Sequence, residues 1–344
     1  MIPLLLPVAS ALAAAPSFFI VNGQVEPGFP HVVALGLDLD GRPFTVCSGN
    51  LITPRVVLSA AHCSGDYPID LVVEFGVAWF ADETGQPVTS VPLETGAIHP
   101  DYEPLQSGGP TGTSYGRFDL AVVTLAEDAP VPAGRLYTGA LSDEMVGMEL
   151  FSVGYGLTDG DDGDSGGIKH SVPLVLSDLW DQFLINQADD NPTGGTTCSG
   201  DSGGPQLGRV RADLPDDPAT WPQVGVHSWG QSGCVGRSAA TRVDQGLGWI
   251  LDQVEAVHGS RDLCEINGVY DDGVCDTWCD APDPDCEDTP VDPVETAGGC
   301  AVAPGVAGGW IGLLPLLAGR VRRRPGRTRR STLPPPCSPP PPTP

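Results

Sequence analysis

Three short segments carry residue types that together could cleave a peptide or an ester bond. LSAAHC contains His62, DLAVVTL begins with Asp119, and CSGDSGGP contains Ser202. A serine hydroxyl is a poor nucleophile until a neighbouring imidazole removes its proton, and that imidazole needs a carboxylate to fix its tautomer and stabilise its cation. A lone histidine or aspartate would be weak evidence, but the order His, Asp, Ser is typical of one class of catalytic triads. We therefore predict a triad of these three residues.

The elements that must position this triad are short β-strands. Between residues 20 and 260, apolar runs of four to eight residues alternate with Gly, Pro, Asn and Asp, and examples are HVVALGL, NLITPRVVLSA, DLVVEFGVAWF and QVGVHSWG. The last run, GWILDQVEAVHG, has apolar residues at helical spacing. The pattern predicts an all-β sandwich or pair of barrels that ends in a helix.

These segments resemble the trypsin/chymotrypsin-like serine proteases. The similar motifs are IVNG at 20–23, AAHC at 60–63, DLA at 119–121, GDSGGP at 200–205 and SWG at 228–230. The resemblance covers about residues 20–260 and implies two six-stranded β-barrels with the active site between them. It also implies that Ser202 attacks the peptide carbonyl, that His62 transfers the proton, and that the amides of Gly200 and Ser202 form the oxyanion hole.

The resemblance implies activation by cleavage. In the family, the residue at the position of Asp201 pairs with the free α-amine created by a cut before the residue that is Ile20 here. The preceding residues are Ser17, Phe18 and Phe19 rather than Lys or Arg. Cleavage after Phe19 would need a chymotrypsin- or elastase-like protease, or processing soon after export, and the identity of the activator stays open.

The family pattern also indicates which residues contact the substrate. Thr196 would form the base of the specificity pocket, Gly230 and Ser238 its walls, and Ser228, Trp229 and Gly230 the strand that pairs with the substrate backbone. None of these residues is a carboxylate, and a buried substrate cation would need one. We therefore expect cleavage after neutral residues rather than after Lys or Arg.

Ten cysteines suit a disulfide framework in an exported chain. The resemblance implies the pairs Cys47 with Cys63 and Cys198 with Cys234. A second group, Cys264, Cys275, Cys279 and Cys286, is expected to form two disulfides of open connectivity, with a four-thiolate zinc site as the alternative. Four acids near these cysteines could bind calcium: Asp271, Asp272, Asp276 and Asp280. The preferred interpretation is that they are solvated acids on a small disulfide knot. No metal or cofactor is therefore predicted.

The ends of the chain read as targeting segments. Residues 1–15 are apolar and contain Ala-Leu-Ala at 11–13, which fits a signal peptide and its cleavage site, with a buried strand as the alternative. We expect the chain to consist of a signal peptide at 1–15, a prosegment at 16–19, a protease domain at 20–260, a Cys- and Asp-rich module at 261–287, a linker at 288–299, a sorting or transmembrane tail at 300–330, and a proline-rich tail at 331–344.

The tail combines an apolar stretch with a basic block. Residues 301–319 carry no charge and would span about 28 Å as a helix, close to the roughly 30 Å of a bilayer core. Seven arginines follow within 320–330. The order Gly-Gly-Cys300, apolar stretch and arginines resembles the C-terminal sorting tails (MYXO-CTERM type) of some exported proteins, so anchoring at the cell surface is expected. A clipped low-complexity tail is the alternative, and a glycolipid-anchor signal fits less well.

The charge and composition of the chain exclude two classes of protein. The net charge of −27 excludes a typical nucleic-acid binder, and 45 glycines with 36 prolines in 344 residues exclude a long coiled coil. The sequence predicts an exported or surface-tethered serine endopeptidase whose partners are protein or peptide substrates and an activating protease. The alternatives are a non-catalytic adhesion or calcium-binding protein on the same scaffold, and an esterase that uses the same triad.

Overall fold

The computed structural model describes residues 20–65, 67–104 and 117–286. The expected signal peptide, prosegment, linker and C-terminal tails lie outside the described residues. Within the described part, no helix has both the length and the apolar character needed to cross a bilayer.

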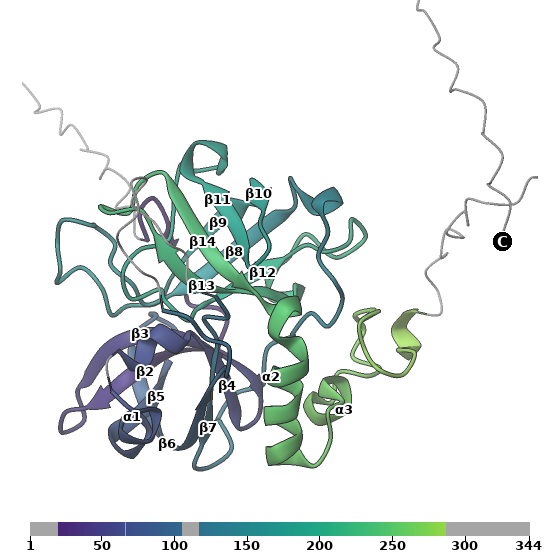
Figure 1. The fold of residues 1–344 in the computed structure, drawn as a ribbon, viewed down its shortest axis with the longest axis horizontal. Coiled ribbons are helices and arrows are strands. Elements are labelled where there is room, and N and C mark those ends of the chain that lie inside the picture. The colour runs from purple at the N-terminus through teal and green to yellow at the C-terminus, as the bar shows by residue number, and fades with distance from the viewer. Residues whose placement is uncertain (1–19, 66, 105–116, 287–344) are drawn as a thin grey trace, which may run out of the picture. The chain divides into compact units, whose positions relative to one another are not determined.

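Six antiparallel strands close into a barrel in the order β2-β3-β4-β7-β6-β5 (Figure 1). Their successive side chains point to opposite faces, and in β4 and β7 both faces are buried. Val57 and Val123 face one apolar cluster, whereas Val56, Leu58 and Val122 join a second cluster that includes a C-terminal helix. The strand bounds are β2 Val32–Asp38, β3 Pro43–Thr53, β4 Val56–Ser59, β5 Gly76–Ala81, β6 Pro87–Ile98 and β7 Ala121–Leu125.

The second sheet has eight strands in the order β1-β9-β8-β12-β13-β14-β11-β10. The expectation of a second closed six-stranded barrel was wrong for the described residues. Strands β9 and β11 could have closed the barrel, but their outer edges pair with the two-residue strands β1 and β10. The bounds are β1 Gln24–Val25, β8 Glu149–Gly154, β9 His170–Val175, β10 Asp178–Leu179, β11 Phe183–Gln187, β12 Pro205–Gly208, β13 Gln223–Gly230 and β14 Arg237–Arg242.

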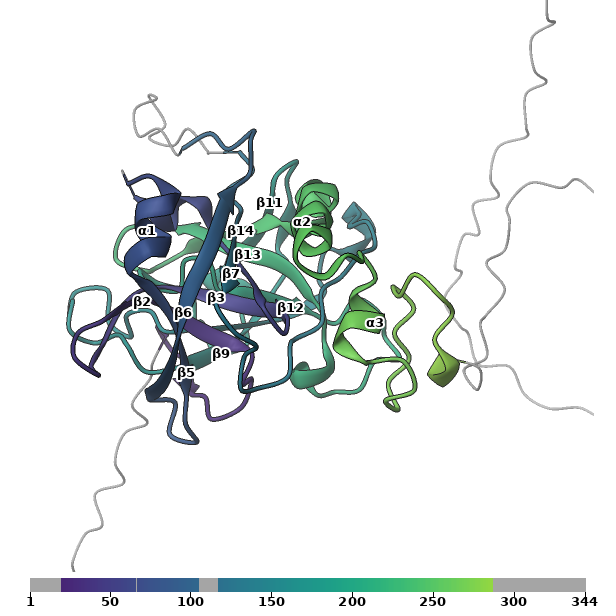
Figure 2. The same cartoon turned by 90° about the horizontal axis from the view of Figure 1, so that it is seen from below.

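The predicted C-terminal helix is confirmed as α2 (Val243–His258), which ends at Gly259 in the left-handed conformation. Ile250 and Val254 pack against the barrel cluster. The segment DLVVEFGVAWF, predicted as one strand, divides into α1 (Ile69–Phe75) and β5. Figure 2 shows α1 beside β6. Val73 of this helix is buried in the barrel cluster that contains Val57 and Val123, and Ile69 packs against that cluster.

Short 3-10 helices connect several strands, and a third α-helix follows α2. The 3-10 helices are η1 Ala61–Ser64, η2 Asp143–Met145, η3 Ala188–Asp190, η4 Pro218–Thr220 and η5 Pro284–Cys286. Helix α3 (Leu263–Asn267) begins at Asp262, whose carboxylate accepts hydrogen bonds from the amides of Cys264 and Glu265.

The cysteine-rich module contains two disulfides, Cys264–Cys279 and Cys275–Cys286. The zinc alternative is therefore wrong, because a disulfide sulfur is not a thiolate ligand. The module also buries more apolar surface than its composition suggests, since Leu263 and Trp278 are 7% and 8% exposed. It is packed against the barrel-and-sheet body rather than standing apart from it.

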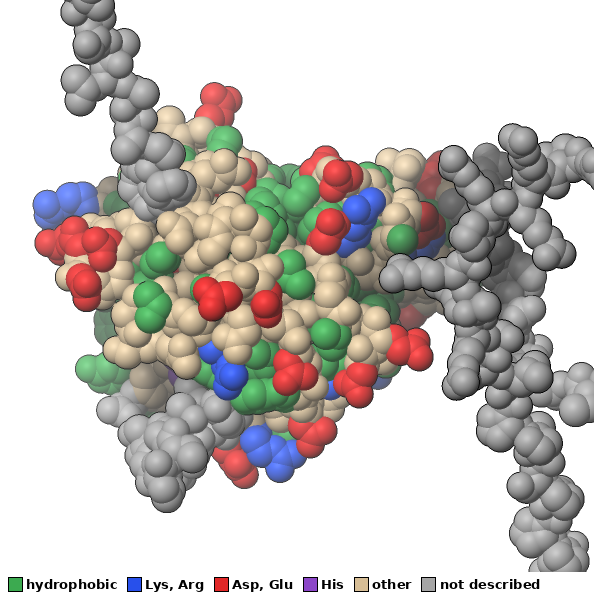
Figure 3. All heavy atoms as spheres, turned by 90° about the horizontal axis from the view of Figure 1, so that it is seen from above, with side chains coloured by type: hydrophobic (Ala, Val, Ile, Leu, Met, Phe, Trp, Pro, Cys, Tyr) green, Lys and Arg blue, Asp and Glu red, His purple; other side chains and the backbone are tan. Residues whose placement is uncertain are grey.

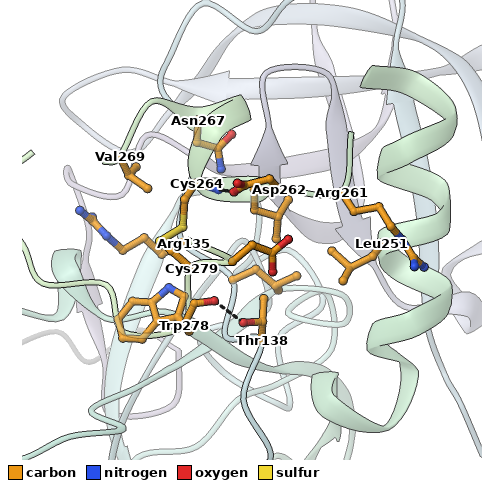
Figure 4. A pocket seen from close by; sticks show the side chains of 13 residues that line it. Arg135, Thr138, Leu251, Arg261, Asp262, Cys264, Asn267, Val269, Trp278 and Cys279 are labelled. Atoms are coloured by element: carbon orange, nitrogen blue, oxygen red, sulfur yellow. Dashed lines mark hydrogen bonds between the residues drawn. A yellow bond between two sulfur atoms is a disulfide. The ribbon is translucent and has the colours of Figure 1, made fainter. Parts of the chain in front are cut away.

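Polar contacts fix the module in place (Figure 4). The Thr138 hydroxyl donates to the carbonyl oxygen of Trp278 at 2.5 Å, and Asn267 donates to the Ile52 carbonyl at 2.9 Å. Arg135 donates through Nε to Asp276 at 3.1 Å and through Nη2 to Asp272. The cavity left between the module and the body measures about 20 Å³, which is room for about one water molecule.

The acids of the module are not all solvated. Asp276 is fully buried and Asp283 is 3% exposed, and Asp283 accepts a hydrogen bond from the Asp276 amide at 2.7 Å. Burial raises the pKa of Asp276 to about 6, although the neighbouring Arg135 opposes the shift. The expectation of solvated acid was therefore wrong for Asp276, one of the four acids for which it was made. Elsewhere, on the face in Figure 3, acidic side chains are scattered rather than gathered in one patch.

Removing Arg135 should destabilise the protein strongly. Arg135→Ala leaves the buried Asp276 carboxylate without its cation, which costs about 3–5 kcal/mol of unfolding free energy. Arg261→Ala is the control, because Arg261 pairs with Asp252 at the surface and should cost about 1 kcal/mol or less. Denaturant unfolding with the disulfides intact measures both variants, and equal losses would contradict the anchoring role of Arg135.

Candidate active site

The first two predicted triad residues are held together by a buried carboxylate. His62 lies in η1, directly after β4, and Asp119 lies two residues before β7. Asp119 is 1% exposed. Its Oδ2 lies 2.7 Å from His62 Nδ1 and accepts from Ser228 Oγ at 2.5 Å, while its Oδ1 accepts from the His62 backbone amide at 2.9 Å. Because a carboxylate can only accept, the proton belongs on Nδ1 and Nε2 is left as a base.

Ser202 lies in a tight turn between the segment 196–199 and β12. Gly200 and Gly203 in this turn have φ values of 94° and 82°, which L side chains rarely adopt. A Cβ on Gly203 would stand 2.3 Å from the Ser48 carbonyl oxygen, so only glycine fits there. The Gly203 amide donates to the His227 carbonyl at 2.8 Å, which fastens the turn to β13.

The turn that carries Ser202 also contacts the barrel that carries His62. The Ser202 carbonyl oxygen accepts from the Ser48 amide at 2.8 Å and lies 3.7 Å from Cys63 Sγ. The structure has the disulfides Cys47–Cys63, beside His62, and Cys198–Cys234, beside this turn. Among the described residues, no hydrogen bond joins the Ser202 hydroxyl to His62, whose ring is bound through Nδ1 to Asp119.

Asp201 and Ile20 are both buried. The Asp201 carboxylate accepts from the amides of Cys198 and Gly156 at 2.8 and 2.9 Å, and burial still raises the pKa of Asp201 to about 7. The segment that follows Ile20 lies against the loop before Ser202, because the Val21 carbonyl accepts from the Thr196 amide at 3.1 Å. No ion pair with Asp201 is found in the described part of the chain, where the Ile20 nitrogen is a peptide nitrogen.

Two of the expected substrate-contacting residues, Gly230 and Ser238, lie side by side on the central strands β13 and β14 of the second sheet. Gly230 pairs with Ser238 across β13 and β14, and a Cβ on Gly230 would stand 3.8 Å from Ser238 Cβ and 3.7 Å from the Thr197 carbonyl. Thr196 and Ser238 are buried. The Ser238 hydroxyl has no hydrogen-bond partner within the described residues. Trp229 packs edge-on against Phe183, with ring centroids 6.0 Å apart.

One further residue beside the site was missed by sequence reasoning. His227 is 2% exposed, and its Nδ1 lies 3.0 Å from the Thr197 hydroxyl oxygen. Burial and the neighbouring His62 lower the pKa of His227 to about 3. It is therefore a neutral imidazole at any pH near neutrality. The signal for it was its position directly before Ser228, in a strand already assigned to the site.

A closed six-stranded barrel, a second β-sheet and a His-Asp pair beside a Gly-Asp-Ser-Gly turn together define the chymotrypsin-like class of serine hydrolases. The trypsin family model matches residues 20–250, and the chain belongs to this family of serine-type endopeptidases.

Two relatives and one solved structure illustrate the similarity. The chain is 30% identical over 250 residues to a chymotrypsin of Phaedon cochleariae, covering 70% of this chain and 84% of that protein. It is 28% identical over 268 residues to the serine protease Hayan of Drosophila melanogaster, covering 69% of this chain but only 39% of that longer protein. Neuropsin, a serine protease of mouse brain, has a similar fold, with a TM-score of 0.50 and 19% identity over 67% of this chain and 98% of its own.

The Asp119–His62 contact gives a direct test. Asp119→Asn keeps the shape but allows the wrong imidazole tautomer, and we expect kcat to fall about 10⁴-fold, the size known for this substitution in a related serine protease. Ser228→Ala removes one hydrogen bond to the same carboxylate and should cost about 10- to 100-fold. Peptide hydrolysis at pH 8 measures both, with thermal unfolding as the control for folding. Full activity of Asp119→Asn would contradict the assignment.

Proposed function

We propose that this protein is an exported serine endopeptidase that uses His62, Asp119 and Ser202. The observation that carries the proposal is the buried Asp119 carboxylate, which holds both the backbone and the ring of His62. That arrangement directs Nδ1 to the carboxylate and leaves Nε2 to act as the general base, on a His62 side chain that is 30% exposed. The four described disulfides are consistent with an extracellular protein.

The mechanism follows from these groups. Ser202 Oγ attacks the carbonyl carbon of the scissile bond while His62 Nε2 takes its proton, and Asp119 stabilises the resulting imidazolium. His62 then protonates the leaving amine, and the acyl group stays on Ser202 until water, deprotonated by His62, releases it.

The amides of Gly200 and Ser202 stabilise the negative oxygen that forms during the attack. Their proposed role is supported by the left-handed backbone of Gly200. In addition, neither amide donates a hydrogen bond to another atom of the described residues.

The substrate residue on the acyl side of the cleaved bond is proposed to be neutral rather than Lys or Arg. Thr196, Gly230 and Ser238, the residues assigned to the specificity site, include no carboxylate. Ser238, whose hydroxyl has no hydrogen-bond partner within the described residues, instead offers a neutral hydrogen-bonding group. A substrate cation would enter this surrounding without a counter-charge, which is costly.

Activation and location complete the proposal. A protease cuts before Ile20, and the new ammonium group pairs with Asp201, whose raised pKa reflects burial without a cation. Residues 1–15 direct export, and the tail at 300–330, similar to a MYXO-CTERM signal, anchors the protein to the membrane. The apolar stretch followed by arginines in the sequence supports this last step.

A fluorophosphonate probe tests the nucleophile. Chain that has been cut before Ile20 should be labelled on Ser202, and Ser202→Ala should lose both labelling and peptide hydrolysis. Removal of a triad residue leaves about 10³- to 10⁴-fold catalysis over water in this mechanism, so the loss should be large but measurable. Absence of labelling in correctly cut protein would favour the non-catalytic adhesion protein. Labelling with ester but no peptide turnover would favour the esterase.

The pairing of Asp201 with Ile20 is tested by pH. In uncut chain, the pKa of Asp201 is raised above its unfolded value, so the stability should fall as pH rises from about 4 to about 7. Asp201→Asn should remove this slope, and cleavage before Ile20 should weaken the slope and raise turnover sharply. Thermal unfolding of the inactive Ser202→Ala background at each pH measures the slope without self-digestion. An identical slope and turnover before and after cleavage would refute the pairing.

A further inference from the structure

The hydroxyl of Ser48 lies at the contact between the barrel and the turn that carries Ser202. Ser48 belongs to β3 and is fully buried. Its hydroxyl accepts a hydrogen bond from the Tyr155 amide at 2.9 Å and donates to the Gly200 carbonyl at 2.8 Å. A hydroxyl has a single proton and a peptide N–H can only donate, so the direction of both bonds is fixed. The proton of Ser48 is therefore committed to the carbonyl of Gly200.

Gly200 is held by a hydrogen bond on each side. In the peptide before it, the Ser199 carbonyl accepts from the Leu157 amide at 2.7 Å. A trans peptide directs its N–H and C=O in opposite directions, so this contact turns the Gly200 N–H away from Leu157. In the peptide after it, the Gly200 carbonyl accepts from the Ser48 hydroxyl, and no second donor to this carbonyl is found within the described residues.

The bond from Ser48 matters because Gly200 is the least restrained point of the turn. Its φ is 94°, and glycine rotates about its backbone bonds with less steric restriction than any other residue. With its carbonyl free, the two peptides that flank Gly200 could turn relative to each other. Such a rotation would change the direction of the Gly200 N–H, and a hydrogen bond weakens steeply as its donor, proton and acceptor depart from a line.

Ser48 also holds the second residue of the proposed oxyanion hole. Its backbone amide donates to the Ser202 carbonyl at 2.8 Å. One residue thus binds both Gly200 and Ser202, whose amides are proposed to stabilise the negative oxygen. Because β3 is part of the closed barrel, both contacts come from a strand rather than from a loop, which favours a precise spacing of the two amides.

We propose that Ser48 is a positioning residue of the oxyanion hole, whose hydroxyl keeps the Gly200 amide directed at the oxygen that becomes negative during the reaction. The inference rests on the proposed protease function and adds one residue to its machinery. Ser48 acts through Gly200 and does not touch the substrate. Removal of a whole oxyanion-hole donor costs about 10²- to 10³-fold in kcat, so misdirecting one donor should cost less, about 10- to 100-fold.

Ser48→Ala tests the proposal in the full chain cut before Ile20. The substrate is a peptide anilide with a neutral residue before the scissile bond. We expect kcat to fall about 10- to 100-fold while KM stays within about 3-fold, because an interaction made only in the transition state lowers kcat and kcat/KM together. A merely structural role would lower the unfolding temperature without this pattern. Ser48→Thr, which keeps the hydroxyl, should recover most of the loss.

A peptide aldehyde gives an independent measurement. Ser202 Oγ adds to the aldehyde carbon, the Oγ proton passes to His62, and the aldehyde oxygen becomes the negative oxygen that the two amides hold. In Ser48→Ala, the inhibition constant of the aldehyde should rise by the same factor by which kcat falls. The inhibition constant of the matching peptide alcohol, which forms no bond to Ser202, should not change.

Ser152→Ala is the matched control. Ser152 is 1% exposed, and its hydroxyl donates to the carbonyl of Pro205, three residues after Ser202, at 3.3 Å. No hydrogen bond joins Ser152 to Gly200 in the part of the chain that the structure describes. The control therefore loses a buried serine hydroxyl close to the same turn and should keep its kcat. Thermal unfolding of each variant in the Ser202→Ala background measures stability without self-digestion.

Two results would overturn the inference and leave the protease function standing. One is an unchanged kcat and aldehyde affinity in folded Ser48→Ala, and the other is an equal loss of kcat in Ser152→Ala. If Ser48→Ala does not fold, Ser48→Cys takes its place, because a thiol is a weaker donor and should give a smaller loss of the same kind. Failure of the cut wild-type protein to hydrolyse any peptide would refute the proposed function itself, and the inference with it.

Discussion

Asp119 places a carboxylate in the protein interior, where an ion without partners would cost several kcal/mol, on the order of a whole domain's net stability. Its partners come from both halves of the structure. The backbone and ring of His62 reach it from the barrel, and the Ser228 hydroxyl reaches it from the second sheet. The two sheets must therefore dock in one register before this charge is satisfied, and that register aligns η1 with β13.

The turn around Ser202 depends on the same docking. Ser48 in the barrel binds the Ser202 carbonyl and Tyr155 in the second half, and His227 in β13 binds the amide of Gly203. Asp201 in this turn is buried, the hydrogen bonds that it accepts within the described residues come from backbone amides, and burial raises its pKa. One turn thus carries Ser202, the proposed nucleophile, together with the contact between the two sheets and Asp201, the proposed partner of the Ile20 amine.

The site residues could be proposed from local motifs, because a tight turn or a helix cap requires particular residue types at neighbouring positions of the sequence. Gly203 is an example, since the close approach of Ser48 demands glycine within GDSGGP. Contacts between distant segments do not require a local motif. The residues around Arg135 therefore give no indication that it pairs with Asp276, 141 residues later. For the same reason, the apolar run at 70–80 could not be divided into α1 and β5, and the edge pairing of β1 and β10 could not be foreseen.

The apolar surfaces of the described body divide into two kinds, and the difference is informative. Ile250 and Val254 of α2 and Leu263 of α3 share one buried cluster with the barrel strands, so the segment after the catalytic domain completes its core. Around α1, by contrast, Val73 is buried and Ile69 packs against the barrel cluster, while Leu71 and Phe75 on the same short helix remain exposed. Because buried apolar area stabilises a fold and exposed area does not, Val73 contributes to the stability of the barrel and Phe75 contributes little.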